Sequence, residues 1–352
     1  MTPVNRSMVQ FVIAEFFATL LGRRRRDPRT AGGDPLTHAP PAARPLAAHA
    51  GPTLAGMLQT LIDEIGAPEL EREQWLDLAG RISRIAEATP PPPSFPRIAT
   101  QLLALARDPN VDVNDLVGLV QRDAAIASTL LRIANSPAFA PATPIATLRS
   151  AIQSLGIDKV IELVVGSSGR SYYDVASAID LAQFPTLWHG MFSESLANAF
   201  SAGRLALAVS ASRGESALFA GLLADVGRPI ALRILGGLVR DGSEPPSDAL
   251  ALAALDEVSR EISERAITAM NLPDELRAAC IADPVTPTAD AQIARLIASI
   301  GAIQRRSPRI RLNADDVRAR AEQLQLTPYA LRSLFAQRAQ HVREAAELFG
   351  GQ

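Results

Sequence analysis

Short apolar runs with helical spacing, divided by helix-breaking residues, constrain the fold of this chain more than any other feature. Leu116, Leu119 and Val120 recur at three- and four-residue spacing, and similar runs repeat along most of the sequence. Alanine and leucine, both strong helix formers, are abundant, while runs rich in valine, isoleucine and tyrosine are scarce. We therefore predict an all-α protein made of many short helices.

Polar residues at the ends of these runs predict where helices begin and end. Asp112 precedes an apolar run as an N-cap, and Asp115 follows in the first turn, where a negative charge favours the helix dipole. Thr147 has the same place before the next run, which Gly156 closes. Asn135 ends another run, and we interpret it as a C-cap and turn residue. Helices of this length with short loops indicate a compact bundle.

The composition narrows the class of protein. A chain of 352 residues is long enough for two or three domains, and 47% hydrophobic residues supply a core. The net charge of −2 gives no global field toward nucleic acid or membrane, so we expect no nucleic-acid partner. Cys280 is the single cysteine of the sequence, which excludes an intramolecular disulfide and a cysteine-based zinc site. We expect it to be buried as a small apolar residue.

The amino-terminal segment, residues 1–26, combines an apolar run with a basic block. Residues 8–21 are apolar except for a few positions such as Glu15, and the run is shorter than the roughly 20 residues needed to span a bilayer. Four arginines follow at 23–26. Two interpretations stay open: a helix that docks on the protein or on a partner chain, or one that lies in a membrane surface. Residues 27–52, rich in proline, alanine and glycine, predict a flexible linker.

A run of four prolines divides the rest of the chain, because it cannot continue a helix. Before it, residues 53–90 predict a region of two amphipathic helices. After it, we expect a domain over residues 91–300, with two packed helical lobes at about 91–180 and 181–300. A helical tail, residues 301–352, completes the chain.

A small basic segment opens this tail. Arg305, Arg306, Arg309 and Arg311 have no aromatic or base-reading groups beside them, so they do not indicate nucleic-acid binding. We interpret the segment as a solvated loop between two helices.

Three segments carry a resemblance to a known family. They are Leu-Leu-Arg-Ile-Ala-Asn-Ser at 130–136, Ala-Ile-Gln-Ser-Leu-Gly at 151–156 and Gly-Leu-Leu-Ala-Asp-Val-Gly at 221–227. In this order and spacing, the chain resembles the HDOD domain, the HD-related output domain of bacterial signalling proteins, over about residues 91–300. The resemblance implies a multi-helical bundle of two packed lobes, related to the HD-type metal phosphohydrolases.

The resemblance also implies where metal ligands would stand. The HD metal site uses an early histidine, a His-Asp step and a late aspartate. His189 matches the early histidine and Asp225 the aspartate of the step, but Ala224 replaces the histidine of the step. Because two ligands on separate helices rarely hold a metal ion, we expect no metal, no cofactor and no catalytic residue. The remaining family positions fall near Ser259, Ala282, Asp283 and Ser299.

Three residues are candidates for a residual pocket: His189, Asp225 and Arg228. There, Arg228 would supply positive charge to a nucleotide or another anion that is bound without being cleaved. The structural alternative makes His189 a half-buried, hydrogen-bonded residue beside Trp188, and lets Asp225 cap a helix or pair with Arg228.

The resemblance implies a non-catalytic, cytoplasmic signal-transduction module that acts through protein–protein contacts with signalling partners. Residues 8–26 are the candidate for a peripheral contact with the inner membrane. An anion sensor and a metal-dependent phosphohydrolase are the alternative functions.

Overall fold

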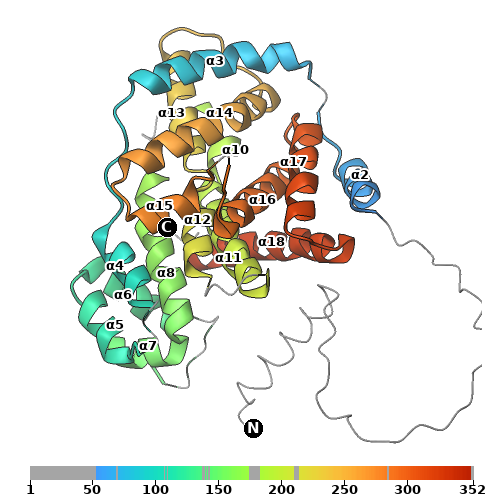
Figure 1. Cartoon of the computed structure of the whole chain (residues 1–352). Coiled ribbons are helices and arrows are strands. Elements are labelled where there is room, and N and C mark those ends of the chain that lie inside the picture. The colour runs from blue at the N-terminus through green and yellow to red at the C-terminus, as the bar shows by residue number, and fades with distance from the viewer. Residues whose placement is uncertain are drawn as a thin grey trace, which may run out of the picture.

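The computed structural model describes residues 53–349, except for short gaps. The described residues form helices and loops and contain no strand, which confirms the all-α prediction (Figure 1). The helix predicted within residues 1–26 and the linker predicted at 27–52 lie outside the described residues. The gaps fall at 69, 107, 109, 137–138, 140, 142, 174–182, 210–213 and 284.

The helices follow one another with short connections. In chain order they are α2 (Leu54–Ile65), α3 (Arg72–Ala88), α4 (Arg97–Ala106), α5 (Val113–Val120), α6 (Ala124–Ala134), α7 (Leu148–Leu155), α8 (Ile157–Gly169), the 3-10 turn η1 (Arg170–Tyr172), α10 (Pro185–Trp188), α11 (Met191–Val209), α12 (Glu215–Leu223), α13 (Gly227–Arg240), α14 (Asp248–Ala269), α15 (Asp274–Cys280), α16 (Ala289–Gln304), α17 (Ile310–Gln323) and α18 (Pro328–Phe349).

Local capping sets several of these boundaries as predicted. The Asp112 carboxylate accepts the backbone N–H groups of Asn114 and Asp115, at 2.6 and 3.1 Å, and so caps α5. Asn135 caps the end of α6 and does more than predicted, because its side-chain amide pairs with both backbone groups of Ile145. This pairing fixes the loop that leads from α6 to α7.

The proline-rich boundary is an extended segment that descends from α3 to α4 (Figure 1). Phe95 anchors it: the ring is buried, lies parallel to Tyr172 at 5.7 Å and meets the edge of Phe219 at 4.9 Å between centroids. The Tyr172 hydroxyl also donates to the Pro93 carbonyl at 2.9 Å. Aromatic packing therefore holds the boundary against both lobes.

The helices α4 to α8 gather at one end of the molecule and form the first lobe (Figure 1). In the second lobe, α11 packs closely on α12, and α3 lies across α13 and α14. The close approach needs Gly221, because a Cβ atom there would lie 2.6 Å from the Asn198 carbonyl oxygen.

The carboxyl-terminal helices belong to the same body. Helix α16 packs on α11 and α12, α18 packs on α11, and α2 closes the cluster against α17 and α18. Residue 300, at which we expected the second lobe to end, lies inside α16. No helix between residues 53 and 349 has both the length and the apolar character needed to cross a membrane.

Candidate functional site

The turn between α12 and α13 carries the motif with the missing histidine. Helix α12 ends at Leu223, and three residues turn the chain before Gly227 begins α13. A side chain at Gly227 would not fit, since its Cβ would lie 2.2 Å from the Ser259 carbonyl oxygen on α14. The Gly227 N–H also donates to the Ser263 hydroxyl at 2.8 Å. The glycine thus lets α13 approach α14 closely.

The end of α12 is held by two hydroxyl groups. Tyr173 and Ser195 both donate to the Leu222 carbonyl oxygen, at 3.0 and 2.5 Å. A helix end leaves such carbonyls without intrahelical partners, so these bonds satisfy a group that would otherwise be orphaned. Burial raises the pKa of Tyr173 well above its usual value, so the hydroxyl remains a donor at any physiological pH.

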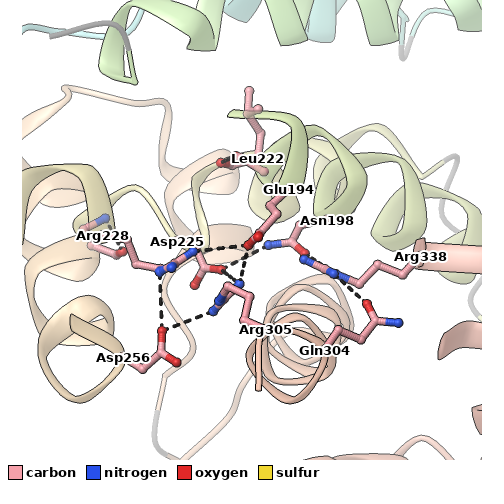
Figure 2. Close-up of polar contacts among 12 residues, drawn as sticks. Glu194, Asn198, Leu222, Asp225, Arg228, Asp256, Gln304, Arg305 and Arg338 are labelled. Atoms are coloured by element: carbon pink, nitrogen blue, oxygen red, sulfur yellow. Dashed lines mark hydrogen bonds and ion pairs between the residues drawn. The ribbon is translucent and has the colours of Figure 1, made fainter. Parts of the chain in front are cut away.

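A buried guanidinium group occupies the centre of the candidate site. Arg305, just after α16, reaches three carboxylates from three other elements (Figure 2). Its Nη1 lies 2.7 Å from Glu194 Oε2 and 3.5 Å from Asp225 Oδ2, and its Nη2 lies 3.2 Å from Asp256 Oδ1. The Arg305 side chain is only 9% exposed. The arginine therefore cross-links α11, the α12–α13 turn and α14.

Arg228 is a second cation in the same cluster. Its Nη1 donates to Glu194 Oε2 at 3.2 Å, and its Nε lies 3.4 Å from Asp256 Oδ1. The side chains of Arg228 and Asp256 are 4% and 3% exposed. Burying a charge is costly unless it is paired, and here each carboxylate faces at least one guanidinium group.

Arg338 extends the network into α18. Its Nε donates to Asn198 Oδ1 at 2.8 Å and its Nη1 to Gln304 Oε1 at 2.7 Å, so both partners are neutral amides. Asn198 in turn donates to Asp225 Oδ2 at 3.3 Å. Burial lowers the pKa of Arg338 to about 10, which still leaves the group charged at neutral pH. The Asn198 amide therefore carries the contact between this buried cation and the acidic cluster.

The carboxylates and guanidinium groups of the cluster balance in charge, and their mutual attraction keeps them ionised. Burial opposes ionisation of Glu194, but Arg305 and Arg228 outweigh burial and hold the pKa of Glu194 below its usual value. For Arg305, burial acts to lower the pKa, and Asp256, Glu194 and Asp225 together raise it above the ordinary value. We define the buried charge network as Glu194, Asn198, Asp225, Arg228, Asp256, Gln304, Arg305 and Arg338.

A cavity of about 330 Å³ opens beside this network. Ala224, Ser259 and Ser299, three positions that the family resemblance assigned to lost metal ligands, all line it together with Asp225. Ala282 and Asp283 are not among its lining residues. The cavity therefore corresponds to the place that the HD resemblance predicts for a metal site.

The residues around the cavity do not fit a metal ion. Asp225 is already engaged by Arg305, and the Ser299 hydroxyl donates to Asp316 at 2.5 Å. Within the part of the chain that the structure describes, no group of three or more histidine, cysteine, aspartate or glutamate residues is arranged to hold a metal. Zinc and related ions need three or four such donors, and the nearest cation to these carboxylates is a guanidinium group.

The predicted site residues are only partly brought together. Asp225 and Arg228 both join the buried charge network, but each pairs with other members rather than with the side chain of the other. His189 is exposed and donates from Nδ1 to the Pro185 carbonyl oxygen at 2.6 Å, outside the network. The structural alternative predicted from the sequence is a half-buried, hydrogen-bonded His189. The hydrogen bond agrees with this prediction, but the side chain is exposed.

The interpretation of the basic segment as a solvated loop was wrong for two of its arginines. Arg305 is buried in the network, and Arg309 pairs with Glu257 at 2.8 Å. Arg306 and Arg311 are exposed, as expected, but Arg311 lies within α17 and not in a loop. Sequence reasoning also missed Glu194, because a single glutamate in an alanine-rich helix is an ordinary surface residue until its partner, 111 positions away, is known.

Comparisons with known proteins agree with the fold. A family model described as the HDOD domain matches residues 93–282. An HDOD domain protein of unknown function from Geobacter sulfurreducens is 17% identical, with a TM-score of 0.54, and the match covers 77% of this chain and 98% of that one. No curated protein sequence matches the chain.

Two further solved structures match with lower TM-scores. A protein from Shewanella amazonensis SB2B, described as a candidate metal-dependent phosphohydrolase, is 14% identical, with a TM-score of 0.45 and coverage of 76% and 98%. The MmoQ response regulator from Methylococcus capsulatus is 24% identical, with a TM-score of 0.27 and coverage of 64% and 93%.

Proposed function

The chain belongs to the HDOD domain family, and from this premise we propose that it is a non-catalytic signal-transduction module that acts through protein–protein contacts. One observation carries the proposal. Arg305 places a cation among Glu194, Asp225 and Asp256, beside the cavity where an HD hydrolase would hold its metal. A lobe whose acidic groups are neutralised by arginine retains its shape and loses the means to activate water.

The loss of the site is distributed over several elements, which supports a role for the lobe as a scaffold. Ala224 stands on the α12–α13 turn, Ser259 on α14 and Ser299 on α16, and all three side chains are unable to bind a divalent ion as imidazole or carboxylate would. Restoring a metal site would require several replacements together with removal of Arg305.

The anion sensor is the second candidate, and the cavity is the observation that favours it. Its lining includes Arg260, Arg295, Arg309 and Arg320. Each of these guanidinium groups pairs with a carboxylate, as in the contact of Arg295 with Glu264 at 2.5 Å. An anion would have to compete with these pairs, so we rank this function below the interaction module.

A metal and activity assay on the full chain tests the proposal. After purification without chelator, metal analysis is expected to give far less than one manganese, iron or zinc ion per chain. Hydrolysis of bis(p-nitrophenyl) phosphate with added Mn²⁺ is expected to stay at the rate without protein. Stoichiometric metal together with hydrolysis would overturn the proposal.

Two further experiments distinguish the anion sensor from the interaction module. For the anion sensor, a rise of the melting temperature with a nucleotide, saturating with concentration, would favour binding. For the interaction module, a cytoplasmic partner captured by the tagged full chain has to bind the purified full chain saturably. If no captured partner binds the purified full chain saturably, and a nucleotide raises the melting temperature saturably, the anion sensor replaces the interaction module as the proposed function.

A further inference from the structure

A large groove lies between the two lobes. It has a volume of about 980 Å³ and lies between α7 and α8 of the first lobe and α11 and α12 of the second. Leu207, near the end of α11, projects into it with 60% of its surface exposed. Leu207 thus adds exposed apolar surface to the groove, and contiguous apolar surface rimmed by polar residues marks interaction sites.

The lining of the groove combines apolar side chains, which we call the floor, with mostly acidic ones, which we call the rim. The floor is supplied by side chains from both lobes, among them Leu155, Ile157, Ile161, Leu207 and Leu218. The rim carries four carboxylates, and a single arginine lines the groove with them. These charged groups are Asp108, Asp158, Glu162, Glu215 and Arg204.

Two of these carboxylates, Asp108 and Asp158, stand exposed at the rim. Glu162 pairs with Lys159 at 2.8 Å, and Lys159 lies outside the lining. Asp158 stands exposed in the first turn of α8, where the helix dipole favours its charge but leaves it open to a cation. An occupant that suits the groove therefore has an apolar surface and positive charge at one end.

The chain itself contains such a segment. Residues 8–21 are predominantly apolar, with phenylalanines at 11, 16 and 17, and four arginines follow at 23–26. Left in water, a run of this kind exposes a large apolar patch, which soluble proteins rarely tolerate. Its order of apolar run and then basic block matches a groove with an apolar floor and an acidic rim.

The connection to the described part of the chain is long enough. Residues 27–52 lie between the basic block and the start of α2 at Leu54. At about 3.5 Å per residue, these 26 residues reach roughly 90 Å when extended. A compact body of about 300 residues is roughly 50 Å across, so the segment can reach any face of it.

From this complementarity we infer that residues 8–26 dock in the groove between the lobes, within the same chain. The apolar run covers the floor, Leu207 included, and the arginines meet the exposed carboxylates of Asp108 and Asp158. The inference does not depend on the proposed absence of catalysis. It gives the groove a tethered occupant that a partner or a membrane would have to displace.

Hydrogen exchange on the full chain tests the docking from both sides. Replacing Phe16 and Phe17 with glutamate changes no residue of the groove, yet is expected to speed amide exchange at 152–162 and 203–209. Leu207→Glu is expected to speed exchange within residues 8–21. Removing a buried leucine corresponds to about tenfold or more in a docking equilibrium, and the exchange rates should change by a similar factor.

A matched control and two alternatives complete the test. Tyr329→Glu alters an equally exposed apolar residue, at 65% exposure on α18, and is expected to leave exchange at both places unchanged. Unchanged exchange in the Leu207 and phenylalanine variants would overturn the inference. Protection that grows with protein concentration would assign the occupant to a second copy instead. Protection within residues 8–21 that appears only with anionic phospholipid vesicles would assign it to a membrane.

Discussion

Removal of the Arg305 side chain is the most direct perturbation of the buried charge network. In Arg305→Ala, Glu194 and Asp256 still face Arg228, at 3.2 and 3.4 Å. Asp225 loses its one ion pair within the described chain. Leaving a buried charge unpaired costs about 3–5 kcal/mol, and the 16% exposure of Asp225 favours the lower end. We expect the free energy of unfolding to fall by about 3 kcal/mol.

Urea unfolding followed by far-ultraviolet circular dichroism measures this loss, because the described fold is helical throughout. Arg311→Ala is the control: this arginine is exposed on α17 and makes no ion pair within the described residues, so its replacement should change stability by less than about 0.5 kcal/mol. Arg305→Lys keeps the charge but cannot bridge three carboxylates, and should recover only part of the loss.

The pH dependence gives this prediction a specific sign. In the folded protein the pKa of Glu194 is held below its usual value, so the ionised side chain stabilises the fold above about pH 4 and loses that effect as the pH falls through the folded pKa. Without Arg305 this advantage shrinks. The difference between wild type and Arg305→Ala should therefore stay constant from pH 7 to about pH 5 and narrow only below about pH 4, as the pH falls through the folded pKa of Glu194. A difference that does not narrow down to about pH 3, or a variant as stable as Arg311→Ala, would refute the ion-pair account.

Three other outcomes follow from single residues. Gly227→Ala should destabilise strongly, since its Cβ would lie 2.2 Å from a backbone oxygen, whereas Gly118→Ala, with open space in α5, should be neutral or slightly stabilising in the same urea assay. Burial lowers the pKa of His341 to about 4, so acidification from pH 6.5 toward pH 4 should cost on the order of 3 kcal/mol, and His341→Gln should show a flatter pH profile of unfolding. Burial raises the pKa of Cys280, the buried thiol, so a thiol reagent should label the native protein far more slowly than the urea-unfolded chain; equal rates would contradict its burial.

The parts of the fold that the sequence predicts are those that local chemistry decides. Asp112 caps α5 through bonds to residues two and three positions away, and Gly156 closes α7 with a positive φ of 83° that favours glycine. The proline boundary follows from the missing N–H of proline itself. Each of these signals lies within a few residues of the structure that it specifies, so a single sequence is sufficient to find it.

The charge network could not be predicted in this way. Glu194 and Arg305 are 111 residues apart, and Arg338 meets Asn198 across 140 positions. An arginine in a basic segment is usually solvated, and nothing in the sequence distinguishes Arg305 from its exposed neighbour Arg306. The phase of α16 and the closeness of α11 and α12 decide which arginine turns inward, and both arise from packing of the whole body.

Two of the three arginines in the network, Arg305 and Arg338, belong to the helical tail and link it to the second lobe. Arg305 and Arg338 lie beyond residue 282, where the match to the family model ends, whereas Glu194, Asp225 and Asp256 lie within it. The matched region by itself thus contains three largely buried acidic groups and one of their arginines, an arrangement that burial would penalise. Arg305, just after α16, pairs with all three acidic groups, and Arg338 on α18 adds a second positive charge. The second lobe and the tail therefore form one electrostatic unit, and an intact lobe requires the helices that follow the family domain.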